Sequence, residues 1–160
     1  MRNEQAGGTD IPLGLRELAV RVGLAGVSIF SCPVAPEDLG KEAIEFASET
    51  NVEQTIAAMS STDIEETFTV KGSIICYSPM VGATSKVASI NHAAKTARDR
   101  AVAILGEIES ELSGNATVTS TVRDARTTEL KISQGLGPEG QLGRVCFVEF
   151  TIEAEAHTTP

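Results

Sequence analysis

Residues that could carry chemistry are few in this chain, and they stand far apart. Its only histidines are His92 and His157. Because these two are far apart in the sequence, an acid–base pair or a metal site built on two histidines is difficult to form. Ser28, Ser31 and Cys32 have no neighbouring histidine, and the Gly-x-Ser-x-Gly sequence of a serine nucleophile is absent. These patterns predict no catalytic centre and no cofactor, and we expect that the protein is not an enzyme.

The three cysteines, Cys32, Cys76 and Cys146, show neither the spacing of metal ligands nor a pairing pattern. An odd number of unpaired cysteines is typical of a reducing compartment such as the cytoplasm. We therefore expect each cysteine to be a small buried hydrophobic residue and not a metal ligand.

A Gly-x-Gly-x-x-Gly sequence runs from Gly135 to Gly140 and matches the pattern of a dinucleotide-binding loop. Such a loop needs a following helix whose first amides hold the pyrophosphate. Here the glycines lie between two strand-like segments and Pro138 removes one amide, so the pattern favours a flexible hairpin turn. The second segment carries a row of carboxylates, typical of a solvated strand face and not of a metal or acid–base site: Glu149, Glu153 and Glu155.

The composition is that of a globular chain with an acidic balance. Its 160 residues suit a single domain, with a hydrophobic share of 41% and a mean hydropathy of +0.02. No apolar run approaches the ~20 residues of a membrane helix, and the polar first ten residues do not form a secretory signal. The 22 acidic and 13 basic residues give a formal net charge of −9, a sign opposite to that expected of a sequence-reading nucleic-acid binder.

The first half of the chain gives weak structural signals. Residues 1–9 lack periodicity and predict a flexible tail, after which a helical pattern begins at Asp10 and ends near Gly23. A short strand is expected over Val27–Phe30, because Cys32-Pro33 stops it. The segments Glu42–Ala47 and Val52–Met59 resemble short strands, but their alanines also fit a helix.

The second half gives stronger signals. Apolar residues alternate with polar ones from Glu65 to Ser78, which predicts a half-buried strand with a bulge or a close backbone approach at Gly72. Between Ser85 and Leu112 the apolar residues recur every three or four positions, beginning at Val87, which predicts a helix about 42 Å long. Residues 122–134 and 144–156 alternate in the same way and predict a hairpin.

These elements predict an α+β fold, in which a mostly antiparallel sheet packs on one long helix and a shorter N-terminal helix. We expect one domain over residues 10–156, preceded by the tail of residues 1–9 and followed by a short C-terminal tail of residues 157–160.

The long predicted helix carries its charges in an unusual order. Basic residues occupy its first half and glutamates its last two turns, the reverse of what the helix macrodipole favours, at ~0.3–1 kcal/mol for each exposed terminal charge. We hypothesise that a neighbouring subunit compensates, each helix end facing its complement on the next copy of a head-to-tail ring. The alternative is that packing of the apolar face overrides the penalty. The residues concerned are Lys86, Lys95, Arg98, Arg100, Glu107, Glu109 and Glu111.

Two loops carry apolar residues that are costly to expose unless a partner covers them. One is Pro79-Met80-Val81, and the other runs from Leu136 to Leu142. Ordinary flexible loops are the alternative. Together with charged residues of the long helix they form the candidate interface: Pro79, Met80, Val81, Leu136, Leu142, Lys95, Arg98, Glu107 and Glu111.

Several blocks of the chain carry a family resemblance: Glu65–Val70, Ala97–Ala101 with Ile104–Glu109, Val122–Ala125, the Gln134-Gly135 turn with Glu139-Gly140, and Val145–Ile152. The predicted N-terminal helix, the strand at Val27 and the turn at Pro33 fit the same layout. In these features the chain resembles the tail terminator proteins of long-tailed (siphovirus-type) bacteriophages, especially those that infect actinobacteria.

The resemblance implies a structural protein of the virion tail and neck, assembled in the host cytoplasm. Six copies would form a ring on the last ring of the tail tube, stop its growth and offer a surface to the head-completion or stopper connector protein. The genome would pass through the lumen without sequence-specific binding, and the acidic balance suits a lumen that repels phosphate. No membrane and no cofactor are implied.

Two other readings stay open. Another neck or tail-tube subunit of the same virion would share most of these features. A small ligand-binding or enzymatic domain with a pocket between the long helix and the sheet has only the fold in its favour.

Overall fold

A computed structural model describes residues 24, 26–30, 33–35, 40–56, 64–80, 85–114, 124–138 and 142–158. The predicted tail of residues 1–9, the helix expected from Asp10, Cys32 and Val81 lie outside these residues. The described part contains five strands and one helix, in the order β1 (Ser28–Phe30), β2 (Glu42–Ile56), β3 (Ile64–Pro79), α2 (Lys86–Gly114), β4 (Asp124–Leu136) and β5 (Gly143–Thr158).

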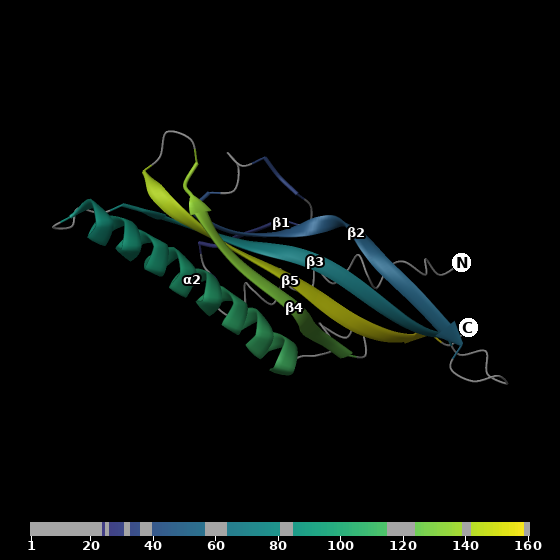
Figure 1. The fold of residues 1–160 in the computed structure, drawn as a ribbon. Helices are drawn as coiled ribbons and strands as arrows, with labels where there is room; N and C mark the ends of the chain where they lie inside the picture. Colours follow the sequence, from purple (N-terminus) through teal and green to yellow (C-terminus); the bar gives the residue numbers. More distant parts are fainter. Residues whose placement is uncertain are drawn as a thin grey trace.

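The five strands form one sheet in the order β1-β2-β3-β5-β4. β3 lies at its centre and pairs antiparallel with β2 and β5, while β4 pairs antiparallel with the outer side of β5. β1 pairs in parallel with β2, from Ser28 opposite Ala43 to Phe30 opposite Glu45. In Figure 1, α2 lies across one face of this sheet, and the far ends of β2, β3 and β5 extend beyond the end of the helix.

The predicted fold class is wrong. Strands make up most of the described residues, the sheet is mixed, and α2 is the one helix in this part of the chain, in place of a mostly antiparallel sheet with two helices. The parallel β1–β2 pair requires a crossover connection between the two strands. Local sequence patterns do not predict such a connection. β2 is a single strand of 15 residues, because pairing with β3 outweighs the weak strand preference of its alanines.

The predicted long helix is confirmed as α2, whose 29 residues span about 44 Å. The amide of Ala88 donates to the hydroxyl of Ser85 at 3.1 Å, which caps the start of the helix. Its buried side packs on β3, β4 and β5. The side chains at the centre of that packing are Ala97, Ala101, Ile104, Ile108, Ile74, Val148, Phe150 and Ile152.

The predicted strand over Glu65–Ser78 and the predicted hairpin are also confirmed, as β3 and as the β4–β5 pair. β5 continues through Thr158, two residues beyond the expected end of the domain at Ala156, because His157 and Thr158 still pair with β3.

Gly72 marks a close approach, as its place in the strand pattern predicts. A Cβ atom at this position would lie 2.6 Å from Cζ of Phe150, whose ring covers the glycine. Phe150 in turn meets Phe46 edge-on, with ring centroids 6.0 Å apart and an interplanar angle of 87°. The irregularity falls in the facing strand, where the register of β2 shifts between Phe46 and Thr50.

Candidate interaction surfaces

The two predicted contact loops meet at one end of the sheet. Pro79, the last residue of β3, pairs with Gly143, the first residue of β5. The amide of Met80 donates to the carbonyl of Leu142 at 3.0 Å, and the hydroxyl of Tyr77 donates to the same oxygen at 3.4 Å. The antiparallel β3–β5 register therefore brings together loops that are more than 50 residues apart in the sequence.

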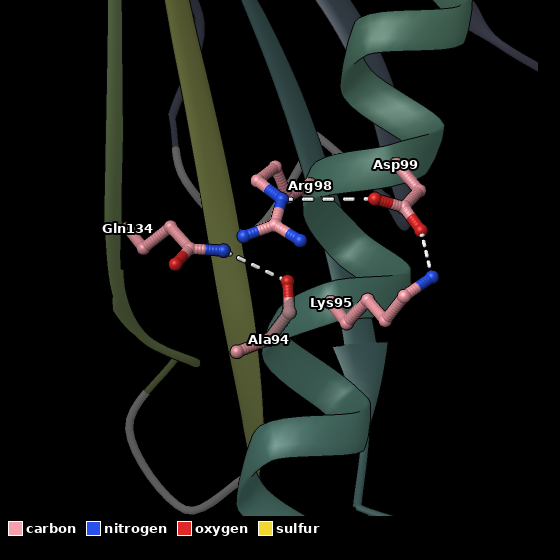
Figure 2. A network of polar contacts seen from close by, with 5 residues as sticks. All are labelled: Ala94, Lys95, Arg98, Asp99 and Gln134. Carbon is pink, nitrogen blue, oxygen red and sulfur yellow. Dashed lines mark hydrogen bonds and ion pairs between the residues drawn. The ribbon is translucent and has the colours of Figure 1, made fainter.

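The side chains at this end are apolar and strongly exposed. Leu136 is 76% exposed and Leu142 is 81% exposed. Val87 is 68% exposed, although its helical spacing predicts burial. It stands two turns before Ala94 on the same side of the helix, and the carbonyl of Ala94 accepts from the Gln134 amide at 2.8 Å (Figure 2). We call this surface the apolar tip: Pro79, Met80, Val87, Leu136 and Leu142.

The glycines of the hairpin serve packing at this tip. A Cβ atom at Gly137 would lie 2.7 Å from the Tyr77 ring, and one at Gly143 would lie 2.4 Å from it. The amide of Gly137 donates to the carbonyl of Gly143 at 3.1 Å and closes the strand pair. The glycine-rich sequence thus gives Tyr77 room against the hairpin, and no helix follows Gly137 among the described residues.

Two candidate basic residues of α2 share an acidic partner within the helix. Lys95 forms an ion pair with Asp99, and Nε of Arg98 lies 3.6 Å from the same carboxylate, as Figure 2 shows. The hydrogen bond from Lys95 holds the pKa of Asp99 below its usual value, with a further contribution from Arg98. Lys95 and Arg98 are therefore partly compensated inside their own chain.

Arg100, unlike Lys95 and Arg98, is paired with a residue outside the helix. Its guanidinium donates two hydrogen bonds of 2.9 Å to the two carboxylate oxygens of Glu42. The hydrogen bonds to Glu42 raise the pKa of Arg100. This fork joins α2 to the start of β2.

The glutamates of the last turns of α2 lie at the other end of the helix. Glu107 and Glu111 are separated from Lys95 and Arg98 by more than two helical turns, so the structure does not bring the four charged candidates together. Neither an acidic residue in the first turn nor a basic one in the last turn offsets the charge order of this helix.

A hollow of about 450 Å³ separates the end of α2 from the start of β4. Its charged rim includes Glu109, Asp124 and Arg126, and its walls include Leu112 and Ala125. We call it the acidic hollow. Sequence analysis missed it, because its residues come from two elements that only the tertiary fold brings together.

The environment of this hollow is rich in carboxylates. Asp124 pairs across the strands with Glu155, which puts two acidic residues opposite each other. Nη2 of Arg126 lies 3.1 Å from Glu153, and this hydrogen bond is the main reason why the pKa of Arg126 is raised. The buried hydroxyl of Thr127 has no hydrogen-bond partner among the described residues.

Three further apolar residues, on β4 and α2, are about half-exposed. β4 forms an edge of the described sheet. Leu130 and Ile132, which are 52% and 50% exposed, share the α2 side of β4 with Gln134. Val102 of the helix is 44% exposed. We call Leu130, Ile132 and Val102 the apolar seam.

The other face of the sheet carries paired charges around a shallow hollow of about 710 Å³. Lys131 and Glu149 form an ion pair of 3.1 Å there. This hollow therefore lies on the face away from α2.

Cys76 and Cys146 are buried, as predicted, and face each other directly across β3 and β5. Burial, with Glu42 as a second cause, raises the pKa of Cys76 to about 12. Burial also raises the pKa of Cys146. Their thiols remain protonated at neutral pH.

Within the described residues, no group of three or more histidine, cysteine, aspartate or glutamate side chains is arranged to hold a metal ion. No helix in the same part of the chain is long and apolar enough to cross a membrane. Comparison with known proteins finds no family model that matches the chain and no curated protein that matches its sequence.

Proposed function

We propose that this protein is a ring-forming structural subunit that caps a phage tail tube, ends the growth of the tube and joins the tail to the head connector. The observation that carries the proposal is the apolar tip, where three chain segments place large apolar side chains in solvent. Exposing such a patch is costly unless another protein surface covers it. The apolar seam on the edge strand β4 adds a second surface of the same kind.

The partners under this proposal are further copies of the chain, the tail tube protein and the connector protein. Six copies would form the ring, as the resemblance to tail terminators implies. The acidic balance of the chain, with its formal net charge of −9, favours passage of the genome through the lumen, because like charges do not adhere.

A tube-capping assay tests the proposal. The purified chain is added to growing tubes of the cognate tail tube protein, and the products are imaged by negative-stain electron microscopy. We expect tubes of limited length with one ring of this chain at one end. Tubes that continue to grow with no ring bound would overturn the proposal, and incorporation of the chain along the whole tube would indicate a tube subunit instead.

A further inference from the structure

Charge is segregated along α2 and the strand ends beside it. The end that bears the apolar tip carries Lys41, Lys86 and Arg144, and Glu42 at this end is already paired with Arg100. The last turns of α2 carry Glu107, Glu109 and Glu111, and Glu109 lines the acidic hollow with Asp124 and with Arg126, which is paired with Glu153. The apolar tip and the acidic hollow are therefore opposite in charge.

The direction of α2 strengthens this polarity. The helix begins at the tip, with Lys86 and Val87, and ends at the hollow, with Glu109 and Leu112. A helix carries roughly half a positive charge at its N-terminus and half a negative charge at its C-terminus. Within one chain these partial charges repel the side chains beside them, but the N-terminus of one α2 placed near the C-terminus of another would be favoured.

The acidic hollow also offers apolar contact. Leu112 and Ala125 contribute to its walls, and both are buried core residues. Because these walls are already buried, the apolar surface removed from water on docking is that of the tip leucines, which are 76% and 81% exposed. Basic residues beside the leucines would meet the carboxylates of the hollow.

We propose that the apolar tip of one copy docks into the acidic hollow of the next copy, with Leu142 and Leu136 against the walls and Lys86 and Arg144 against Glu109 and Asp124. The inference rests on the proposed ring, whose subunit contact it specifies. The contact joins two different surfaces of the chain, so it repeats from copy to copy and closes into a ring when the rotation per copy allows.

Charge-reversal variants test this contact. A tip variant carries Lys86→Glu and Arg144→Glu, and a hollow variant carries Glu109→Lys and Asp124→Lys. Each variant alone places like charges on both surfaces, so we expect the concentration needed for self-association to rise by about 100-fold. An equimolar mixture restores opposite charges at every contact. We expect this mixture to assemble into rings in which the two variants alternate, as measured by mass photometry and sedimentation velocity.

Two single variants serve as matched controls. Lys71→Glu and Glu53→Lys each reverse one charge, in the same directions as the tip and hollow variants, at exposed positions away from both surfaces, and both should assemble as the unaltered chain does. Far-UV circular dichroism and the melting temperature confirm that each variant folds. A chain with all four substitutions should assemble alone, since its reversed tip again faces a reversed hollow.

The outcomes separate this contact from the proposed function. If the tip and hollow variants each assemble like the unaltered chain, or if their mixture remains monomeric, the contact is wrong, whereas rings that still cap tubes leave the tail-terminator function intact. If the unaltered chain stays monomeric at every concentration, the contact is also wrong. The tube-capping assay then decides independently whether the function survives.

Discussion

At the scale of single residues, Gly72 carries a packing constraint that is open to a direct test. Because a Cβ atom there would lie 2.6 Å from Cζ of Phe150, Gly72→Ala forces the ring to move away from Phe46. We expect a loss of about 1–3 kcal/mol in the free energy of unfolding, which is the usual cost of overpacking a core. Urea unfolding followed by circular dichroism measures it.

Gly106→Ala is the matched control for this substitution. Gly106 is exposed in the interior of α2, and a Cβ atom there meets no atom within 4 Å. Alanine should therefore stabilise the protein by roughly 0.5–1 kcal/mol. Combining Gly72→Ala with Phe150→Leu should cost less than the sum of the two single changes, and strict additivity would show that the ring does not cover the glycine.

The buried thiol of Cys76 predicts a pH dependence of stability. Its pKa is raised to about 12 in the folded protein, so the unfolded chain releases this proton at a lower pH than the folded chain does. The stability that the protonated thiol contributes is present below about pH 9 and is lost as the pH rises toward about 12. Urea unfolding between about pH 8 and about pH 11 should show a shallower decline for Cys76→Ala than for the unaltered chain. Parallel declines would contradict the burial of this thiol.

Sequence patterns predict part of this residue-scale detail. A glycine inside an alternating strand indicates a close approach, and even-numbered positions of the same strand indicate that Cys76 is buried. The sequence patterns do not predict which residues face Gly72 and Cys76. The pairs Gly72 with Phe150 and Cys76 with Cys146 depend on the β3–β5 register, which is set by strands about 70 residues apart in the sequence.

At the scale of elements, the Glu42–Arg100 fork fixes α2 against β2. Arg100→Lys keeps the charge but cannot donate both hydrogen bonds in one plane. The Arg100 and Glu42 side chains are 39% and 28% exposed, so water screens the pair and we expect a loss of only about 0.5–1 kcal/mol in unfolding free energy. Arg98→Lys is the control and should change little, because Arg98 has only the 3.6 Å contact with Asp99.

A double-mutant cycle isolates this contact. Glu42→Gln and Arg100→Lys should be less than additive in their effects on urea unfolding, since each removes part of the same fork. Additive losses would mean that the two side chains act independently and that other packing holds α2 against β2.

The elements differ in how well local patterns predict them. α2, β3 and the β4–β5 hairpin have strong periodicities, because each presents one apolar face to the core. β2 has a register shift in its middle, which interrupts its alternation of apolar and polar residues. The parallel β1–β2 pair makes the sheet mixed. This pairing depends on the tertiary fold and has no signal in the local sequence pattern.

At the scale of the whole molecule, the candidate site was predictable in its parts but not in its arrangement. The loops at Pro79 and at Leu136 stand out in the sequence as apolar turns, and α2 shows its reversed charge order. The sequence does not show that both loops and the basic start of α2 occupy one end. The acidic hollow needs Glu109 and Asp124 to face each other across two elements, so it exists only in the folded chain.

Self-association of the chain should depend on salt in a characteristic way. Raising the ionic strength from about 0.05 M to about 0.5 M shortens the Debye length to a few ångströms, so the attraction between the basic tip and the acidic hollow should weaken. The apolar part of the contact is not screened. Mass photometry across this range should therefore show weaker assembly that levels off and does not vanish.

The variant Leu142→Ser separates the two contributions. Its side chain is 81% exposed and only its backbone carbonyl accepts hydrogen bonds within the chain, so folding should be unaffected. Removing a leucine that becomes buried on docking forfeits about 1.5–3 kcal/mol, or roughly a 10- to 150-fold loss of affinity at every salt concentration. The salt dependence should keep its slope, because all the charges remain. If the variant keeps the affinity of the unaltered chain at high salt and changes the slope of the salt dependence, Leu142 lies outside the contact. The association of the copies would then depend on the charged residues only.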